Sequence, residues 1–143
     1  MSAIRYSLFI AAILLSTACA TTAPKNDNLY QELGGKSGIA AIVEEFLNKL
    51  ADDQRIVHYF KNTNIKRFRK KLIEQFCVES GGPCQYTGDS MQQVHAGMHL
   101  KEMDFNALVE DLTDAMDKLK VPTTAQNKLL ARLAPMHKDI IAH

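Results

Sequence analysis

The segment IKRFRKKLIEQFCVES, residues 65–80, carries apolar and basic side chains at a regular helical spacing. Phe68, Leu72 and Phe76 recur at every fourth position, which places them in one stripe along a helix. Lysines and arginines lie on the other face, and the GGP sequence at 81–83 ends the helix. The segment therefore predicts an amphipathic helix whose apolar stripe faces the protein interior.

Other segments with helical spacing lie on both sides of this one. The predicted helices, in chain order, cover residues 29–33, 39–50, 56–60, 65–80, 90–97, 101–120 and 125–141. A threonine at 123–124 is expected to cap the last helix, and Pro135 is expected to kink it. Because no segment alternates apolar and polar residues for long, the sequence predicts an all-α fold.

The composition is that of one ordinary globular domain. The chain has 143 residues, of which 46% are hydrophobic and 23% charged, and these values exclude a disordered or collagen-like chain. Lysine and arginine together number 17, and aspartate and glutamate number 16. A nearly neutral chain has no overall attraction to polyanions, so we expect no nucleic-acid partner.

Residues 1–19, MSAIRYSLFIAAILLSTAC, have the three parts of an export signal. Arg5 gives a positive start, residues 8–15 form an apolar run, and the small residues 16–18 precede Cys19. The run is too short to span a bilayer comfortably, and a buried N-terminal helix is the alternative. We therefore expect an exported protein of the periplasm or cell envelope.

The cleavage site of this signal has two interpretations. The small residues before Cys19 resemble a bacterial lipoprotein signal, in which a lipidated Cys19 anchors the domain to a membrane. The sequence ACA at 18–20 also fits an ordinary A-x-A cleavage site. We favour the lipoprotein, with a signal over 1–19, a polar tether over 20–28 and a domain over 29–143.

Two cysteines remain after Cys19 is set aside. Cys77 and Cys84 are close in sequence, and an oxidising compartment allows them to form a disulfide. Closing so short a loop would stabilise the fold by about 2.5 kcal/mol in the chain-entropy model. A half-buried free thiol at Cys77 is the alternative, and the sequence leaves both open.

Sequence motifs for several common chemistries are absent. The chain has no P-loop, no dinucleotide-binding glycine motif, no serine-hydrolase elbow and no H-E-x-x-H zinc motif. It also lacks the C-x-x-C-H motif, which excludes a covalently attached c-type haem. His95 and His99 have a spacing at which one helix can bind zinc, although Gly97 between them would end that helix. A helical lipoprotein with zinc at this pair is therefore one hypothesis.

Four sequence blocks give a more specific indication. They are LYQELGG at 29–35, ADDQRIVHYF at 51–60, GGPCQYTG at 81–88 and MQQVHAGM at 91–98. In their order and spacing, from Asn28 to about Ile141, the chain resembles the truncated haemoglobins of group I. The resemblance implies a two-over-two helical sandwich around a non-covalently bound haem b.

The resemblance also assigns roles to individual residues. His95 corresponds to the proximal ligand of the haem iron, and a neutral imidazole suits that metal. Phe60 corresponds to the phenylalanine that packs flat on the porphyrin, while Met91 and Val94 form an apolar wall near His95. The remaining expected contacts are the distal residues Phe46, Leu47, Phe68, Leu72 and Phe76 and the haem-edge residues Thr63, Lys71 and Tyr86.

The distal positions differ from those of many group I members. A tyrosine and a glutamine often hold bound oxygen there, but the matching residues are Leu47 and Leu72, which cannot donate hydrogen bonds. We expect a globin that reversibly binds a diatomic gas (oxygen, NO or CO) through His95-ligated haem iron in an apolar pocket. A haem-dependent redox or nitric-oxide-detoxifying enzyme is the alternative. The expected partners are haem, the gas and an unidentified reductase, and the expected state is a monomer.

Overall fold

The computed structural model describes residues 28–141, in which all regular structure is helical, as predicted. Most of the expected export signal and tether therefore lies outside the described residues. The elements, in chain order, are α1 (Leu29–Glu32), α2 (Gly35–Asp52), the 3₁₀ turn η1 (Val57–Phe60), α3 (Ile65–Glu79), α4 (Met91–His95), α5 (Glu102–Lys118), α6 (Thr123–Leu133), the 3₁₀ turn η2 (Ala134–Met136) and α7 (His137–Ile141). None of these helices is long and apolar enough to cross a bilayer.

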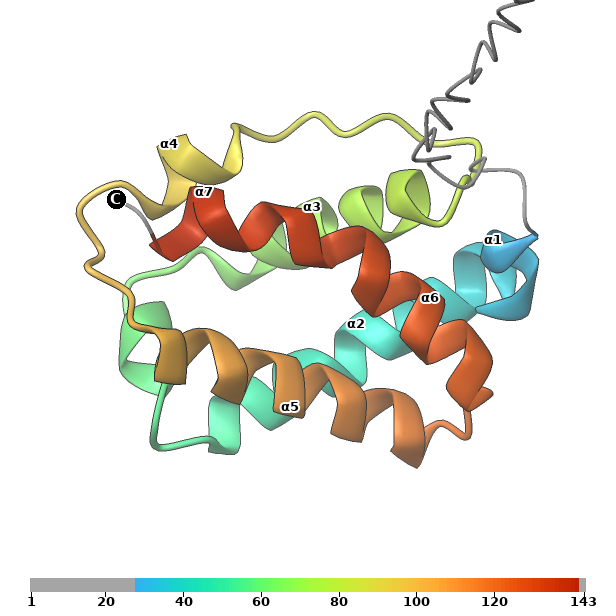
Figure 1. Cartoon of the computed structure of the whole chain (residues 1–143), viewed down its shortest axis with the longest axis horizontal. Helices are drawn as coiled ribbons and strands as arrows, with labels where there is room; N and C mark the ends of the chain where they lie inside the picture. The colour runs from blue at the N-terminus through green and yellow to red at the C-terminus, as the bar shows by residue number, and fades with distance from the viewer. Residues whose placement is uncertain (1–27, 142–143) are drawn as a thin grey trace, which may run out of the picture.

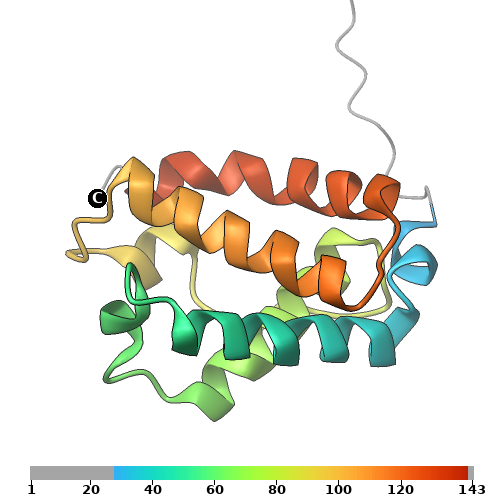
Figure 2. The same cartoon turned by 90° about the horizontal axis from the view of Figure 1, so that it is seen from below.

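The helices form two layers of two (Figures 1 and 2). Helices α2 and α3 make one layer, and α5 with the consecutive α6 and α7 makes the other. Helix α2 packs against both α5 and α3, and α6 packs against α3 and α5. The short α4 lies beside α7, at the opposite end of the molecule from α1. This arrangement is the predicted two-over-two sandwich.

The core lies where α2 crosses its neighbours. Val43 and Phe46 of α2 are 0% and 1% exposed, and Met116 of α5 is 0% exposed. The ring of Phe46 stacks on that of Phe76 of α3, with centroids 6.4 Å apart. The apolar stripe predicted for residues 65–80 therefore faces inward, and its last member joins the two helices of one layer.

Helix α2 begins at Gly35, four residues before the predicted start. Its first turn, GKSG, contains no apolar residue and so gives no periodic signal. Gly38 is required there because a Cβ atom on it would lie 2.0 Å from the backbone oxygen of Leu33. That close approach sets the short α1 against the start of α2.

The last predicted helix is divided at Pro135. The structure has α6, then η2 with Pro135 inside it, then α7, so the predicted kink is confirmed. The predicted threonine cap is wrong, because Pro122 is the N-cap and Thr123 is already helical. Proline at that position presets the backbone angle, and its missing N–H would have no helical partner there in any case.

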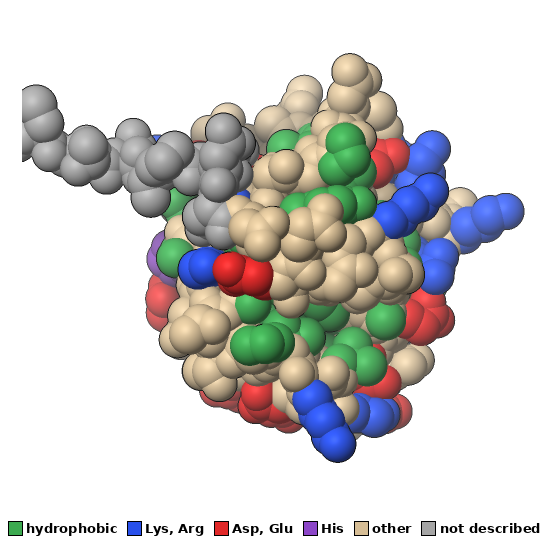
Figure 3. Space-filling model, turned by 90° about the vertical axis from the view of Figure 1, so that its right-hand side faces the viewer, with side chains coloured by type: hydrophobic (Ala, Val, Ile, Leu, Met, Phe, Trp, Pro, Cys, Tyr) green, Lys and Arg blue, Asp and Glu red, His purple; other side chains and the backbone are tan. Residues whose placement is uncertain are grey.

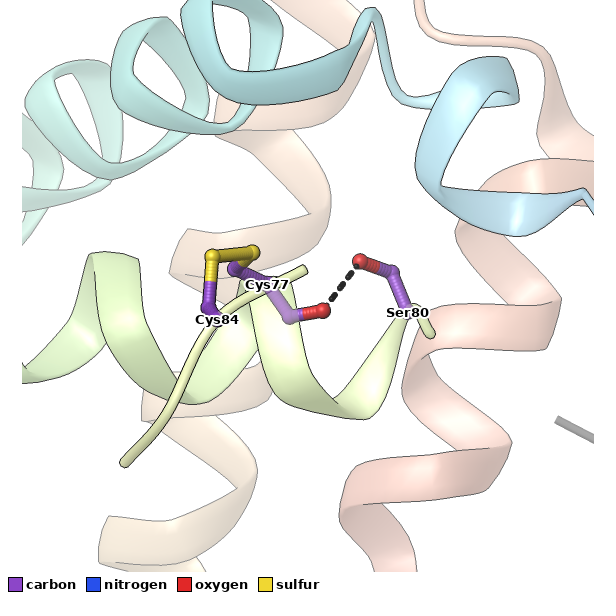
Figure 4. Close-up of a disulfide and its surroundings, with 3 residues drawn as sticks. All are labelled: Cys77, Ser80 and Cys84. Carbon is purple, nitrogen blue, oxygen red and sulfur yellow. Dashed lines mark hydrogen bonds between the residues drawn. A yellow bond between two sulfur atoms is a disulfide. The ribbon is translucent and has the colours of Figure 1, made fainter. Parts of the chain in front are cut away.

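Cys77 and Cys84 form a disulfide, which decides between the two alternatives left open above (Figure 4). Cys77 lies in the last turn of α3 and is 2% exposed. The hydroxyl of Ser80 donates a hydrogen bond of 3.0 Å to the carbonyl of Cys77. The disulfide thereby fastens the start of the non-helical 81–90 segment to the end of α3.

Candidate functional site

A large pocket of about 790 Å³ lies between the two layers. Its walls come from η1, α3, α4, α5 and the final helices, and most of the side chains that line it are apolar. Volume and lining of this kind are typical of sites that hold a small molecule or cofactor.

Every residue predicted to contact haem lies in the lining of this pocket except Leu47. The lining includes Phe46, Phe60, Thr63, Phe68, Lys71, Leu72, Phe76, Tyr86, Met91, Val94 and His95. Leu47 is half-buried against the core, and the preceding residue, Phe46, lines the pocket instead. The fold thus brings together residues that are almost fifty positions apart in sequence, while their contact with haem stays a prediction.

His95 is held in one tautomer by the helix that carries it. Helix α4 starts with a capping box, in which Gln93 N–H donates to Ser90 Oγ and Ser90 N–H donates to Gln93 Oε1. One turn later, His95 Nδ1 lies 2.7 Å from the carbonyl of Met91. Because a carbonyl can only accept, Nδ1 carries a proton, and in the neutral imidazole Nε2 then keeps its lone pair. A histidine oriented in this way is prepared to bind a metal through Nε2.

Aromatic and aliphatic side chains form part of the α3 side of the pocket, beside the polar side chains of that helix. The rings of Phe60 and Phe68 stack with centroids 5.4 Å apart, which ties η1 to α3. Leu72 follows Phe68 by one turn and stays partly exposed to the pocket. This wall has no side-chain hydrogen-bond donor at Phe68, Leu72 or Phe76. These three side chains themselves offer a ligand only carbon atoms.

At the polar edge of the pocket, Lys71 is held by Thr87 and by Glu74. The Glu74 carboxylate accepts from the Thr87 backbone N–H at 3.0 Å and the Thr87 hydroxyl at 2.8 Å, and Lys71 Nζ lies 3.0 Å away. These contacts, led by the Thr87 N–H, lower the pKa of Glu74 to about 2. Lys71 also donates to the Thr87 hydroxyl. Its charge is therefore held at the edge by Glu74 of α3 and by Thr87 of the 81–90 segment.

Three further contacts lie at the edge of the pocket. Arg67 pairs with Asp89 at 3.2 Å, and the hydroxyl of Tyr86 donates to the carbonyl of Asp89 at 3.0 Å. On the η1 side, Tyr59 donates to Asp104 at 2.9 Å. Burial, together with that bond to a carboxylate, raises the pKa of Tyr59.

Some residues of the lining were not predicted from the sequence. Arg67 lies one turn before Lys71 on the same face of α3. The four-residue spacing between them would have indicated that Arg67 also lies at the pocket. Gln75 donates to the sulfur atoms of Met136 at 3.1 Å and Met91 at 3.6 Å, and no sequence pattern pointed to that contact. The α5 and α6 walls add Leu108, Val109, Leu112, Leu130 and Leu133, which sequence alone cannot distinguish from ordinary core.

The donor set fits haem better than zinc. Helix α4 ends at His95, whereas His99 lies beyond Gly97 and has a positive φ of 51° itself. The two histidines therefore do not share a helix face. Between residues 28 and 141 no three His, Cys, Asp or Glu side chains gather as metal ligands. One imidazole with a free Nε2, an apolar pocket, and basic Arg67 and Lys71 at its edge match a metalloporphyrin with anionic propionates.

Comparison with known proteins agrees with this geometry. A family model described as a bacterial-like globin matches residues 28–142. A group 1 truncated hemoglobin from Tetrahymena pyriformis is 31% identical over 117 residues, which is 82% of this chain and 97% of that protein. Another, from Mycolicibacterium paratuberculosis, is 31% identical over 113 residues, or 79% of this chain and 83% of that one.

A solved structure agrees as well. The crystal structure of the Tetrahymena pyriformis truncated hemoglobin in its Fe(III) form has a TM-score of 0.76 to this chain at 31% identity. The match covers 79% of this chain and 97% of that one. The chain therefore belongs to the bacterial-like globins and, within them, to the haem-binding group 1 truncated haemoglobins.

Proposed function

We propose that this globin holds haem b without a covalent bond, through Nε2 of His95, and reversibly binds a diatomic gas. The observation that carries the proposal is the 2.7 Å hydrogen bond from His95 Nδ1 to the Met91 carbonyl, because it occupies Nδ1 and leaves Nε2 of this pocket-lining histidine for a metal. Haem iron supplies an open coordination site for oxygen, nitric oxide or carbon monoxide.

The chain's own residues have three tasks in this proposal. Phe60 and Phe68 provide flat apolar surface for the porphyrin, and Leu72 and Phe76 exclude water from the gas-binding side. Arg67 and Lys71 offer positive charge to the propionates at the edge of the pocket. The Lys71–Glu74–Thr87 contacts keep that edge in place.

The absence of a donor at Leu72 affects which gas is held well. Bound dioxygen carries partial negative charge, and a hydrogen bond to such a group contributes roughly 1.5–3 kcal/mol. Without that bond, oxygen affinity is lower by about ten- to a hundredfold than in a pocket with a donor. Carbon monoxide and nitric oxide depend less on a donor, so their binding is affected less.

The cellular place of the protein is part of the proposal. The signal-like residues 1–19 support export, and Cys19 supports a lipid anchor in the cell envelope. From Cys19 to Asn28 the extended chain spans at most about 30 Å. A tether of that length would keep the globin close to the membrane surface.

Spectroscopy of the haem-loaded protein tests the gas-binding proposal. We expect the ferrous spectrum to change on addition of carbon monoxide or oxygen and to return when the gas is removed. A ferrous spectrum that does not change on addition of either gas would refute the proposal. A nitric-oxide pulse on the oxygen complex distinguishes the enzyme alternative, because rapid and repeated nitrate formation would make the protein a nitric-oxide-consuming enzyme.

A further inference from the structure

A second pocket, of about 460 Å³, lies on the side of α3 that faces away from the haem pocket. It is formed where the start of α2 approaches the middle of α3 and the first residues of the 81–90 segment. Within the described residues, none of those that line it also lines the first pocket. The globin function therefore does not explain it.

Positive charge dominates the polar part of this second pocket. Lys36, Arg69 and Lys70 line it, and Glu74 is the acidic residue found among its described lining residues. The Glu74 carboxylate is directed to Lys71 and Thr87, and Lys70 lies 3.8 Å from it. The pocket is thus lined by three cations and one carboxylate, whose shortest contacts are to Lys71 and Thr87 outside the lining.

The individual cations keep capacity for a ligand. Arg69 gives its Nε–H to Glu44 at 2.6 Å, and that bond leaves the two terminal nitrogens of the guanidinium for other contacts. Lys36 makes no ion pair within the described part of the chain. It lies in the first turn of α2, which contains no acidic residue, so the positive end of the helix dipole adds to its charge.

The rest of the pocket is apolar and firmly packed. Tyr30, Ile73 and Pro83 form its apolar surface together with the Cys77–Cys84 disulfide. A Cβ atom on Gly82 would lie 2.4 Å from the Tyr30 ring and 2.6 Å from Cys77 Sγ, which shows how closely these groups meet. The surface therefore exists before any ligand arrives.

We propose that this second pocket binds an anionic amphiphile. Its carboxylate or phosphate head would contact Lys36, Arg69 and Lys70, and its apolar part would lie over Tyr30 and Ile73. The same chemistry is offered by a free amphiphilic acid and by the headgroup of a membrane lipid. The pocket begins only two residues after Asn28, where the described chain starts. Figure 3 shows this end of the molecule, where apolar side chains are exposed and basic side chains, with acidic ones between them, lie along one edge.

The test uses the haem-loaded protein carrying Cys19→Ser, so that no acyl anchor contributes. Octyl phosphate represents the free amphiphile, and vesicles of zwitterionic lipid with or without added anionic lipid represent the membrane. Binding is measured by calorimetry and by methyl NMR shifts at Ile73. Lys36→Gln and Lys70→Gln remove charge from the pocket, and Lys66→Gln removes the same charge from α3 outside it.

We expect octyl phosphate to shift Ile73 and each pocket variant to weaken binding by about fivefold, with Lys66→Gln unchanged. Vesicle binding that needs anionic lipid and the same two lysines identifies the lipid as the source. Octyl phosphate binding without vesicle binding identifies a free amphiphile. The proposal is overturned if octyl phosphate does not bind or if all three variants respond alike. An unchanged Soret band in the variants keeps this result separate from the haem proposal.

Discussion

Asp111 is a carboxyl group that the fold keeps away from water. It lies on α5, is 7% exposed, and its Oδ2 has no hydrogen-bond partner within the described chain. Burial and the neighbouring negative charge of Asp53 raise its pKa to about 6, although Arg55 and Lys49 oppose the shift. At neutral pH the protein therefore carries a buried charge with incomplete compensation.

This burial predicts a pH dependence of stability. A carboxyl whose pKa is raised by folding stabilises the folded state while it is protonated, and that contribution is lost as pH rises from about 4 through about 6. We expect the unfolding free energy to fall over this range by at most about 3 kcal/mol through this group. Urea denaturation at several pH values measures this dependence, and we expect the fall in unfolding free energy to be absent in Asp111→Asn. Asp52→Asn, which removes an exposed carboxyl at the end of α2, is the control. A pH profile of Asp111→Asn parallel to wild type would contradict the assignment.

Leu72 permits a second prediction for a single residue. Leu72→Gln introduces a donor into the pocket wall, and we expect oxygen to dissociate roughly ten- to a hundredfold more slowly. Leu72→Met is the control, since it changes the shape without adding a donor. Leu47→Tyr should have a smaller effect, because Leu47 does not line the pocket. Replacement of oxygen by carbon monoxide measures the rates, and a larger effect at Leu47 would show that α2 is turned differently around the haem.

The sequence predicts the interior of the helices better than their ends. The stripe of Phe68, Leu72 and Phe76 follows directly from its period, and α3 ends at Glu79, within one residue of the prediction. The start of α2 at Gly35 could not be predicted from the hydrophobic period, because the steric fit between Gly38 and the backbone of Leu33 determines it. Helix ends depend on such contacts and on capping, which hydrophobic period does not encode.

The disulfide gives a prediction at the scale of elements. Cys77 and Cys84 are seven positions apart in sequence, and their bond closes a loop between α3 and the 81–90 segment. For such a loop the chain-entropy model gives about 2.5 kcal/mol of stabilisation of the folded state. We expect Cys84→Ser, or reduction of the wild type, to lower the unfolding free energy by about that amount in urea denaturation. Substitution and reduction both remove the disulfide, so equal losses of unfolding free energy from the two would assign the loss to the bond itself. A reduced protein as stable as the oxidised one would contradict this role for the bond.

At the scale of the molecule, the haem pocket depends on elements far apart in sequence. Periodicity indicated which side chains face inward, but only the resemblance to a family indicated that His95, Phe60 and the α3 stripe share one site. The structure brings them together and adds Arg67 and Gln75. The second pocket was not predicted, because Lys36 and Lys70 meet only through the packing of α2 on α3.

Titration of the haem-free protein with hemin tests the central claim most directly. We expect a Soret band that saturates at about one haem per chain, with His95→Ala losing or shifting the band because the iron loses its protein ligand. His99→Ala, which changes the neighbouring histidine outside α4, should titrate like the wild type. A wild type that develops no Soret band, or a His95→Ala band identical to that of the wild type, would contradict the account.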